Sequence, residues 1–170
     1  MMTLNDDARA ANPGIIKIIG IGQSLRGDDA AGLEAVRLWQ EAYQSTQARL
    51  AVQVELVELP GVSLLNLLEG SQAAILVDAI RSDARPGTIQ VLSEKQLAVF
   101  TQGSGSAHGW GVAETLSLGR QLLPSSMPEK LVLIGIEASQ LRLGEALSPE
   151  VNSALPEAAR LIEQHVLEQG

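Results

Sequence analysis

Two apolar runs constrain the fold of this chain more than any other feature of its sequence. Residues 15–21 lie between glycines and are mostly isoleucine, and residues 73–79 are apolar except for one aspartate near their end. Runs of this length and composition are typical of β-strands that are buried on both faces. A sheet of such strands needs helices on both sides, so the sequence indicates an α/β protein.

Strands and helices alternate along the rest of the chain. Further strands are predicted at residues 52–57, 88–92 and 130–136, and helices at residues 33–47, 63–69, 111–123 and 149–168. This alternation predicts a three-layer α/β/α sandwich around a mostly parallel sheet of five strands.

The link between the third and fourth predicted strands is short. Only residues 81–87 separate them, whereas a parallel crossover needs about a dozen residues or more. The fourth strand should therefore run antiparallel to the third if the two are neighbours, which makes the sheet mixed.

The length and composition indicate one domain. The chain has 170 residues, and 45% of them are hydrophobic, which is enough for a single core. We expect a flexible leader over residues 1–14 and a single α/β domain over residues 15–170. The leader is polar and contains no signal-peptide pattern, and no run is long enough to span a membrane. We therefore predict a cytoplasmic protein with no membrane partner.

The charge and the rare residue types exclude several classes of function. The net charge of −8 and the aromatic content of 2% leave no basic, aromatic surface for nucleic acid. The absence of cysteine removes thiolate metal ligands and a cysteine nucleophile. Any metal must therefore be held by His, Asp or Glu.

Several acidic side chains follow predicted strands. In sheets of this kind, ligands bind outside the carboxyl ends of the strands. The first strand leads to Asp28 and Asp29, the third to Asp78 and the fifth to Glu137, while a polar loop carries His108. Three of these groups could form a site of two carboxylates and one histidine. Such a site suits Zn²⁺ or Ni²⁺ and leaves positions open for water or for a partner's groups.

Each candidate also has a structural interpretation. The aspartates of the first turn could cap the helix that follows. Asp78 could cap a turn, and His108 could be a solvated loop histidine. We expect Glu137 to be structural and His165, in the last helix, to lie on the surface.

The sequence is a poor match for dinucleotide binding and for catalysis by a serine nucleophile. The glycines at 20 and 22 begin a dinucleotide-binding pattern, but Leu25 stands where the third glycine belongs. Two carboxylates then occupy the place of a pyrophosphate site. No G-x-S-x-G motif surrounds a serine, so Ser104 and Ser106 are not expected to act as nucleophiles.

Three blocks of sequence resemble the hydrogenase maturation proteases. They are Gly-Ile-Gly-Gln-Ser-Leu-Arg-Gly-Asp-Asp-Ala-Ala-Gly at 20–32, Leu-Val-Asp-Ala at 76–79 and Ser-Ala-His-Gly at 106–109. The resemblance runs in order over nearly the whole chain, and the first block is the most specific. It implies a phosphorylase/hydrolase-like sandwich with a five-stranded mixed sheet whose fourth strand is antiparallel.

The resemblance also implies an activity and its residues. The family members are endopeptidases that remove a C-terminal extension from the large-subunit precursor of nickel–iron hydrogenases after nickel insertion. By this resemblance, Asp29, Asp78 and His108 bind the metal, which the substrate carries and which zinc or cadmium could replace in vitro. Asp29 or Asp78 would also act in catalysis, by an aspartic-type or a metal-assisted route. We expect no resident cofactor and a monomer.

Two segments depart from the family pattern. Gly22 is followed by Gln23 where the family usually has asparagine, and residues 60–63 read Pro-Gly-Val-Ser instead of a glycine-rich turn. The second segment is expected to contact the substrate. Two rival functions stay open: a nickel-binding assembly chaperone that does not cleave, and a nucleoside or peptidyl-nucleotide hydrolase of similar fold.

Overall fold

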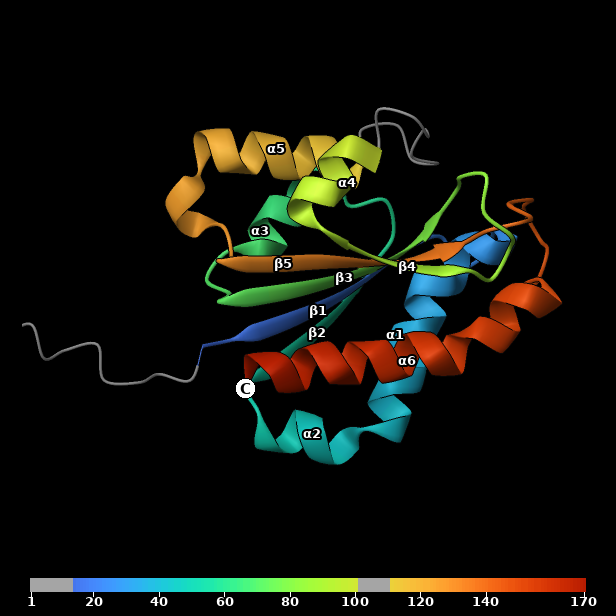
Figure 1. Cartoon of the computed structure of the whole chain (residues 1–170), viewed down its shortest axis with the longest axis horizontal. Helices are drawn as coiled ribbons and strands as arrows, with labels where there is room; N and C mark the ends of the chain where they lie inside the picture. The colour runs from blue at the N-terminus through green and yellow to red at the C-terminus, as the bar shows by residue number, and fades with distance from the viewer. Residues whose placement is uncertain (1–13, 101–110) are drawn as a thin grey trace, which may run out of the picture.

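The computed structural model describes residues 14–100 and 111–170, which form a five-stranded sheet between two layers of helices (Figure 1). The strand order is β2-β1-β3-β5-β4, and all neighbours are parallel except β4 and β5. The strands are β1 (Ile16–Ile21), β2 (Val52–Val57), β3 (Ala73–Ile80), β4 (Ile89–Ser93) and β5 (Lys130–Glu137). The predicted mixed sheet with an antiparallel fourth strand is confirmed.

β4 does not lie beside β3, the neighbour that the sequence analysis considered for it. β5 lies between β3 and β4, with Val91 of β4 opposite Ile134 of β5. The link between β3 and β4 therefore passes the end of β5. The short length of this link still explains why β4 is reversed, because the chain turns back without a crossover helix.

The helices divide between the two faces of the sheet. α1 (Ala31–Ala42), α2 (Gln44–Arg49) and α6 (Pro149–Gln169) cover one face, and α3 (Leu64–Leu68), α4 (Glu94–Phe100) and α5 (Val112–Leu122) cover the other (Figure 1). Three short 3-10 turns complete the pattern: η1 (Gly27–Ala30), η2 (Gly61–Ser63) and η3 (Pro124–Ser126). No helix in the described ranges is long and apolar enough to cross a membrane.

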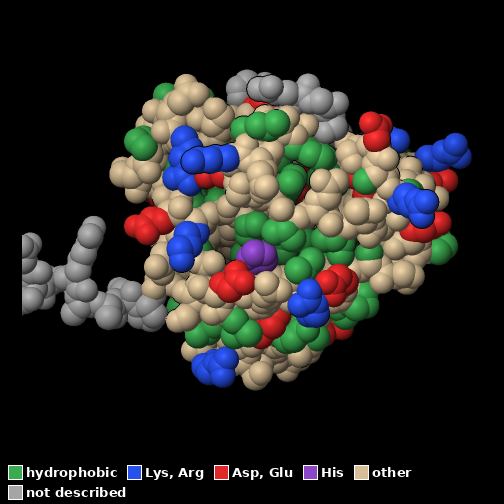
Figure 2. Space-filling model, viewed as in Figure 1, with side chains coloured by type: hydrophobic (Ala, Val, Ile, Leu, Met, Phe, Trp, Pro, Cys, Tyr) green, Lys and Arg blue, Asp and Glu red, His purple; other side chains and the backbone are tan. Residues whose placement is uncertain are grey.

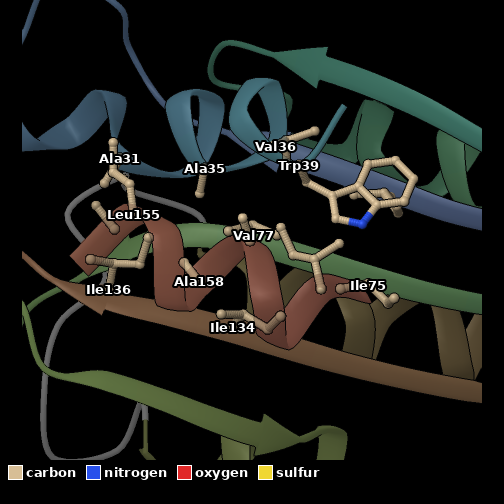
Figure 3. Packing of buried hydrophobic residues seen from close by; sticks show 14 of the residues in the cluster. Ala31, Ala35, Val36, Trp39, Ile75, Val77, Ile134, Ile136, Leu155 and Ala158 are labelled. Atoms are coloured by element: carbon tan, nitrogen blue, oxygen red, sulfur yellow. The ribbon is translucent and has the colours of Figure 1, made fainter. Parts of the chain in front are cut away.

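The alternation of side chains in β3 builds a core on each face. Ile75 and Val77 belong to the cluster that packs against α1 and α6, where Figure 3 shows them beside Trp39 and Ala158. Leu76 and its even-numbered neighbours belong to the cluster under α3, α4 and α5. Because successive side chains of a strand point to opposite faces, Asp78 lies on the α3–α5 side.

The predicted helix over residues 33–47 is wrong as a single element. α1 ends at Ala42, and Tyr43 leaves the helical region with φ −123° and ψ 37° before α2 begins. The break lets the Thr46 hydroxyl donate to the Glu163 carboxylate of α6, which also accepts the indole N–H of Trp39 at 3.0 Å. A tertiary contact therefore overrides the helical periodicity.

The sequence analysis also missed α4. Its start carries a capping box: the Gln96 N–H donates to the Ser93 hydroxyl oxygen at 3.3 Å, and the Ser93 N–H donates to the Gln96 side chain at 2.9 Å. Ser-x-x-Gln is a recognised helix-start signal. Leu97 of α4 is buried in the core, which anchors this short helix.

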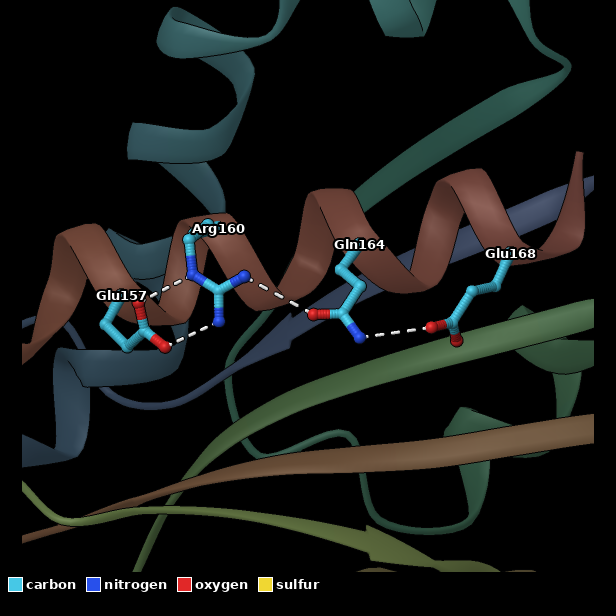
Figure 4. Close-up of polar contacts among 4 residues, drawn as sticks. All are labelled: Glu157, Arg160, Gln164 and Glu168. Carbon is cyan, nitrogen blue, oxygen red and sulfur yellow. Dashed lines mark hydrogen bonds and ion pairs between the residues drawn. The ribbon is translucent and has the colours of Figure 1, made fainter.

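The outer surface contributes less to stability than these cores. On α6, Arg160 donates to Glu157 and Gln164, and Gln164 donates to Glu168 (Figure 4). Exposed pairs of this kind contribute little to stability, because water screens the charges and ordering the side chains costs entropy. Figure 2 shows Lys and Arg side chains interspersed with Asp and Glu on one face of the molecule. The apolar side of α6 therefore holds it to the sheet.

The close approach of α1 to the sheet requires a glycine. A β-carbon at Gly32 would overlap the backbone carbonyl oxygens of Ile21, at the end of β1, and of Val77 in β3. Backbone atoms cannot move aside as a flexible side chain can. Gly32 therefore sets how closely the first turn of α1 sits over these two strands.

We predict that Gly32→Ala destabilises the protein by about 3 kcal/mol, because α1 must move away from the sheet. Gly119→Ala is the matched control: the atoms nearest to a β-carbon there belong to the flexible side chains of Leu65 and Met127, and alanine favours a helix by about 1 kcal/mol. Urea unfolding checks both variants. Equal effects of the two substitutions would contradict the role given to Gly32.

Candidate active site

The candidate site lies at the carboxyl ends of β1 and β3. The strand order reverses between them, because the chain passes from β1 to β2 on one side and then returns through α3 to β3 on the other. Ligands of open α/β sheets bind at such a switch point. The turn η1, which carries Asp28 and Asp29, follows β1 and contacts β3.

Four carboxylates of the described residues are buried, and all of them belong to this edge of the sheet. Asp28, Asp29, Asp78 and Glu137 are between 0% and 5% exposed. Aspartate and glutamate are almost never fully buried unless they are paired. Each of the four therefore needs a physical reason for its position.

Asp28 is bound to the loop between β5 and α6. Its Oδ2 accepts the N–H groups of Ser139 at 2.8 Å and Gln140 at 3.0 Å and the Ser148 hydroxyl at 2.9 Å, and its Oδ1 accepts the Ser148 N–H at 2.6 Å. Ser148 is the N-cap of α6. The predicted capping of the first helix is therefore wrong for Asp28: the caps of η1 and α1 are Arg26 and Ala30, without side-chain bonds.

The hydrogen bonds keep Asp28 ionised. Burial is the largest single influence and acts to raise its pKa, but the bonds from Gln140, Ser148 and Ser139 together outweigh it. The pKa of Asp28 therefore lies below the ordinary value of 3.8. The charged form stabilises the fold above that value.

Glu137 has the same structural role at the neighbouring link. It ends β5, and its carboxylate accepts the Ser82 N–H at 2.6 Å and the Ser82 hydroxyl at 2.8 Å. These bonds fix the link between β3 and β4. The prediction that Glu137 is structural is confirmed.

Asp29 and Asp78 are the other two buried carboxylates of this edge, and they are the two for which the sequence predicts a catalytic role. Asp29 is 2% exposed and comes from η1, while Asp78 is 5% exposed and comes from β3. β3 continues two residues beyond Asp78, and Glu137 bonds the turn that follows. The place of Asp78 inside the strand, beside the carboxyl end of β1, is compatible with a role at the site.

A pocket of about 140 Å³ opens beside Asp78 on the α3–α5 side. Apart from Asp78 and Thr115 it is lined by apolar side chains and backbone, from Ile21, Leu59, Pro60, Gly61, Leu64 and Val112. A larger hollow of about 740 Å³ lies between α4 and α5, near Ser93 and Lys130, and contains none of the predicted site residues. The smaller pocket is thus the one next to a candidate catalytic group.

The predicted histidine ligand cannot be placed. His108, like Ser104 and Ser106, lies outside the described residues. Within residues 14–100 and 111–170, no three His, Asp or Glu side chains are grouped so that they could hold a metal ion. The ligand set of Asp29, Asp78 and His108 stays a prediction.

The other histidine differs from its prediction. The side chain of His165 is only 19% exposed, and its Nδ1 lies 3.2 Å from Glu168 Oε2. It faces the amino-terminal ends of β3 and β5, near Ala73 and Lys130. The prediction of a surface residue is wrong in part, and His165 lies far from the candidate site along the sheet.

Comparisons with known proteins agree with this architecture. A sequence model of the family described as hydrogenase maturation protease matches residues 35–165. This chain belongs to the hydrogenase maturation protease family. The match covers more than half of the chain and spans Asp78 and the position of His108.

Individual relatives extend the match. The hydrogenase 2 maturation protease of Escherichia coli is 27% identical over 158 residues, which cover 91% of this chain and 92% of the relative. The solved structure of the hydrogenase maturating endopeptidase HybD from E. coli superposes with a TM-score of 0.74 at 25% identity, covering 91% and 93% of the two chains. HybD from Thermococcus kodakarensis gives 0.72 at 28% identity, covering 89% and 98%. The family is one of peptidases, which favours that reading over a nucleoside hydrolase.

Two features of the site were missed by the sequence analysis. The partners of Asp28 lie more than 110 positions away along the chain, so no local pattern could reveal them. The walls of the pocket come from several elements and a loop that lie far apart along the chain. Only the Pro-Gly pair at 60–61 signalled a loop at this place.

We predict that Asp28→Asn lowers the free energy of unfolding by about 3 kcal/mol at neutral pH, because charge-assisted bonds are lost. In the wild type, the contribution of the Asp28 charge to the free energy of unfolding is complete above pH 3.8. It is lost as the pH falls through the pKa of Asp28 in the folded state, which lies below that value. Urea unfolding between pH 2 and pH 7 checks both points. The exposed Asp83 supplies the control, Asp83→Asn; identical pH profiles of the two variants would contradict the prediction.

Proposed function

We propose that this protein is the endopeptidase that removes the C-terminal extension from the large-subunit precursor of a nickel–iron hydrogenase after nickel insertion. Membership of the maturation protease family supports the proposal. The observation that carries the site assignment is the pair of buried aspartates, Asp29 and Asp78, at the switch point between β1 and β3. Cytoplasmic location and a monomeric state stay predictions from the sequence.

The metal in this proposal belongs to the substrate. Asp29, Asp78 and His108 would ligate the nickel that the precursor presents, and the precursor's own groups would complete its coordination. Two carboxylates and an imidazole suit a borderline divalent ion. Zinc or cadmium would take the same position in vitro. Recognition of nickel would then ensure that only a loaded precursor is cut.

Cleavage is hydrolysis of one peptide bond. The oxygen of a water molecule attacks the carbonyl carbon, and its proton passes to Asp29 or Asp78. The carbon–nitrogen bond then breaks as the leaving amine takes up a proton. Two routes can supply the nucleophile: a carboxylate acting as general base, or water polarised by the nickel. In either route, holding the scissile bond beside the aspartates supplies a large share of the rate enhancement.

The exposed turn after β2 supports an encounter with a protein substrate. Leu59 and Val62 are both more than half exposed, and Leu59 also lines the pocket with Asp78. This is the segment in which the sequence departs from the family pattern. We assign it to contact with the particular precursor that this enzyme serves.

We predict that Asp29→Asn, Asp78→Asn and His108→Ala each slow processing of nickel-loaded precursor about 100-fold or more. Mass spectrometry of the precursor before and after incubation measures the rate and locates the cut. Asp83→Asn, an exposed carboxylate in the β3–β4 link, is the control and should process at the wild-type rate. Undiminished cleavage by all three site variants would refute the site assignment.

A nickel-free precursor separates recognition from chemistry. If nickel is the recognition element, this precursor is left uncut by the wild type under conditions in which the loaded form is processed. Equal rates on the two forms would contradict metal recognition. Tight nickel binding without any cleavage would instead identify the assembly chaperone considered above.

A further inference from the structure

The pocket beside Asp78 has the properties of a side-chain binding site. Its volume of about 140 Å³ is close to that of an apolar protein cavity that holds benzene, about 150 Å³. Among residues 14–100 and 111–170, its lining side chains are apolar apart from Asp78 and Thr115. One aliphatic side chain fits such a space, whereas a negatively charged side chain would lose its hydration and lie beside the carboxylate of Asp78.

Leu59, which forms the outer lip of the pocket, has an unusual backbone conformation. Leu59 has a φ of 47°, and it is the only residue other than glycine with positive φ in the described ranges. This region is unfavourable for a leucine because its β-carbon crowds the backbone. The side chain is 55% exposed, so burial in the core of the fold does not compensate for the strain. Strain of this kind gathers at functional sites.

The position of the pocket limits which part of a substrate can enter it. Among the described residues of its lining, Asp78 is the one ionisable group, and in the proposed function it acts on the scissile bond. An extended peptide advances about 3.3 Å per residue. Only the residues that directly flank the bond can therefore reach a pocket that shares a wall with this carboxylate.

Resting on the proposed function, we propose that this pocket binds the aliphatic side chain of a precursor residue that flanks the scissile bond. Leu59 closes the pocket from outside, and Val112, at the first position of α5, forms part of the wall. Binding of this side chain sets the bond against Asp78. The pocket thus adds a sequence requirement to the recognition of nickel.

Two variants change the size of the pocket in opposite directions. Leu59→Gly removes the lip and keeps the backbone, because glycine adopts a positive φ without steric cost. Val112→Phe fills the space from a partly buried position. Leu123→Gly is the matched control: this leucine is also about half exposed, but it follows α5 at the other edge of the sheet.

The test is competition between two nickel-loaded precursors in one reaction, followed by mass spectrometry. The cut is first located with the unaltered precursor; each flanking residue is then replaced in turn by leucine, glycine or aspartate. The ratio of kcat/KM values follows from the two product yields. The wild type should prefer leucine over glycine about tenfold or more at one flanking position, and should reject aspartate.

The variants must change this ratio and not only the overall rate. Leu59→Gly should bring the leucine-to-glycine ratio close to one, Val112→Phe should reverse it, and Leu123→Gly should leave it unchanged. Cleavage by the wild type without discrimination at either flanking position would overturn the proposal and leave the proposed function intact. A failure of the wild type to cut any loaded precursor would overturn the proposed function and this inference with it.

Discussion

One buried carboxylate joins the beginning of this fold to its end. Asp28 follows the first strand, and its four hydrogen bonds hold both the loop after the last strand and the N-cap of the final helix. These bonds are favourable because every donor points at an ionised group in a site with no exposure to solvent. The adjacent residue, Asp29, therefore lies in a turn that is fixed by hydrogen bonds to the last part of the chain.

The carboxyl edge of the sheet divides its acidic residues between two kinds of task. Asp28 and Glu137 each accept several hydrogen bonds from loops and so stabilise the edge. Asp29, in the turn after β1, and Asp78, in β3, lie at the switch point. A rigid edge of this kind holds the side chains at the switch point in fixed positions, which is what the positioning of a reacting bond requires.

Much of this arrangement could be predicted from the sequence. The apolar runs gave the central strands, and the short link gave the direction of the fourth strand. The carboxylates that follow strands one, three and five were expected at one edge, and all four are buried there: Asp28, Asp29, Asp78 and Glu137. The helix break at Tyr43 and the partners of Asp28 were not predictable, because both depend on contacts with α6 more than 100 residues later.

By itself, the sequence determined the fold class and the residue types available for chemistry, since hydrophobic periodicity, glycine positions and the lack of cysteine are local properties. The tertiary structure alone decided that Asp28 supports the fold. Asp28 and Asp29 are adjacent and chemically identical, and in the sequence only the resemblance to a family distinguished them. Asp28 supports the fold because the folded chain places hydrogen-bond donors from the loop after β5 and from the N-cap of α6 around its carboxylate.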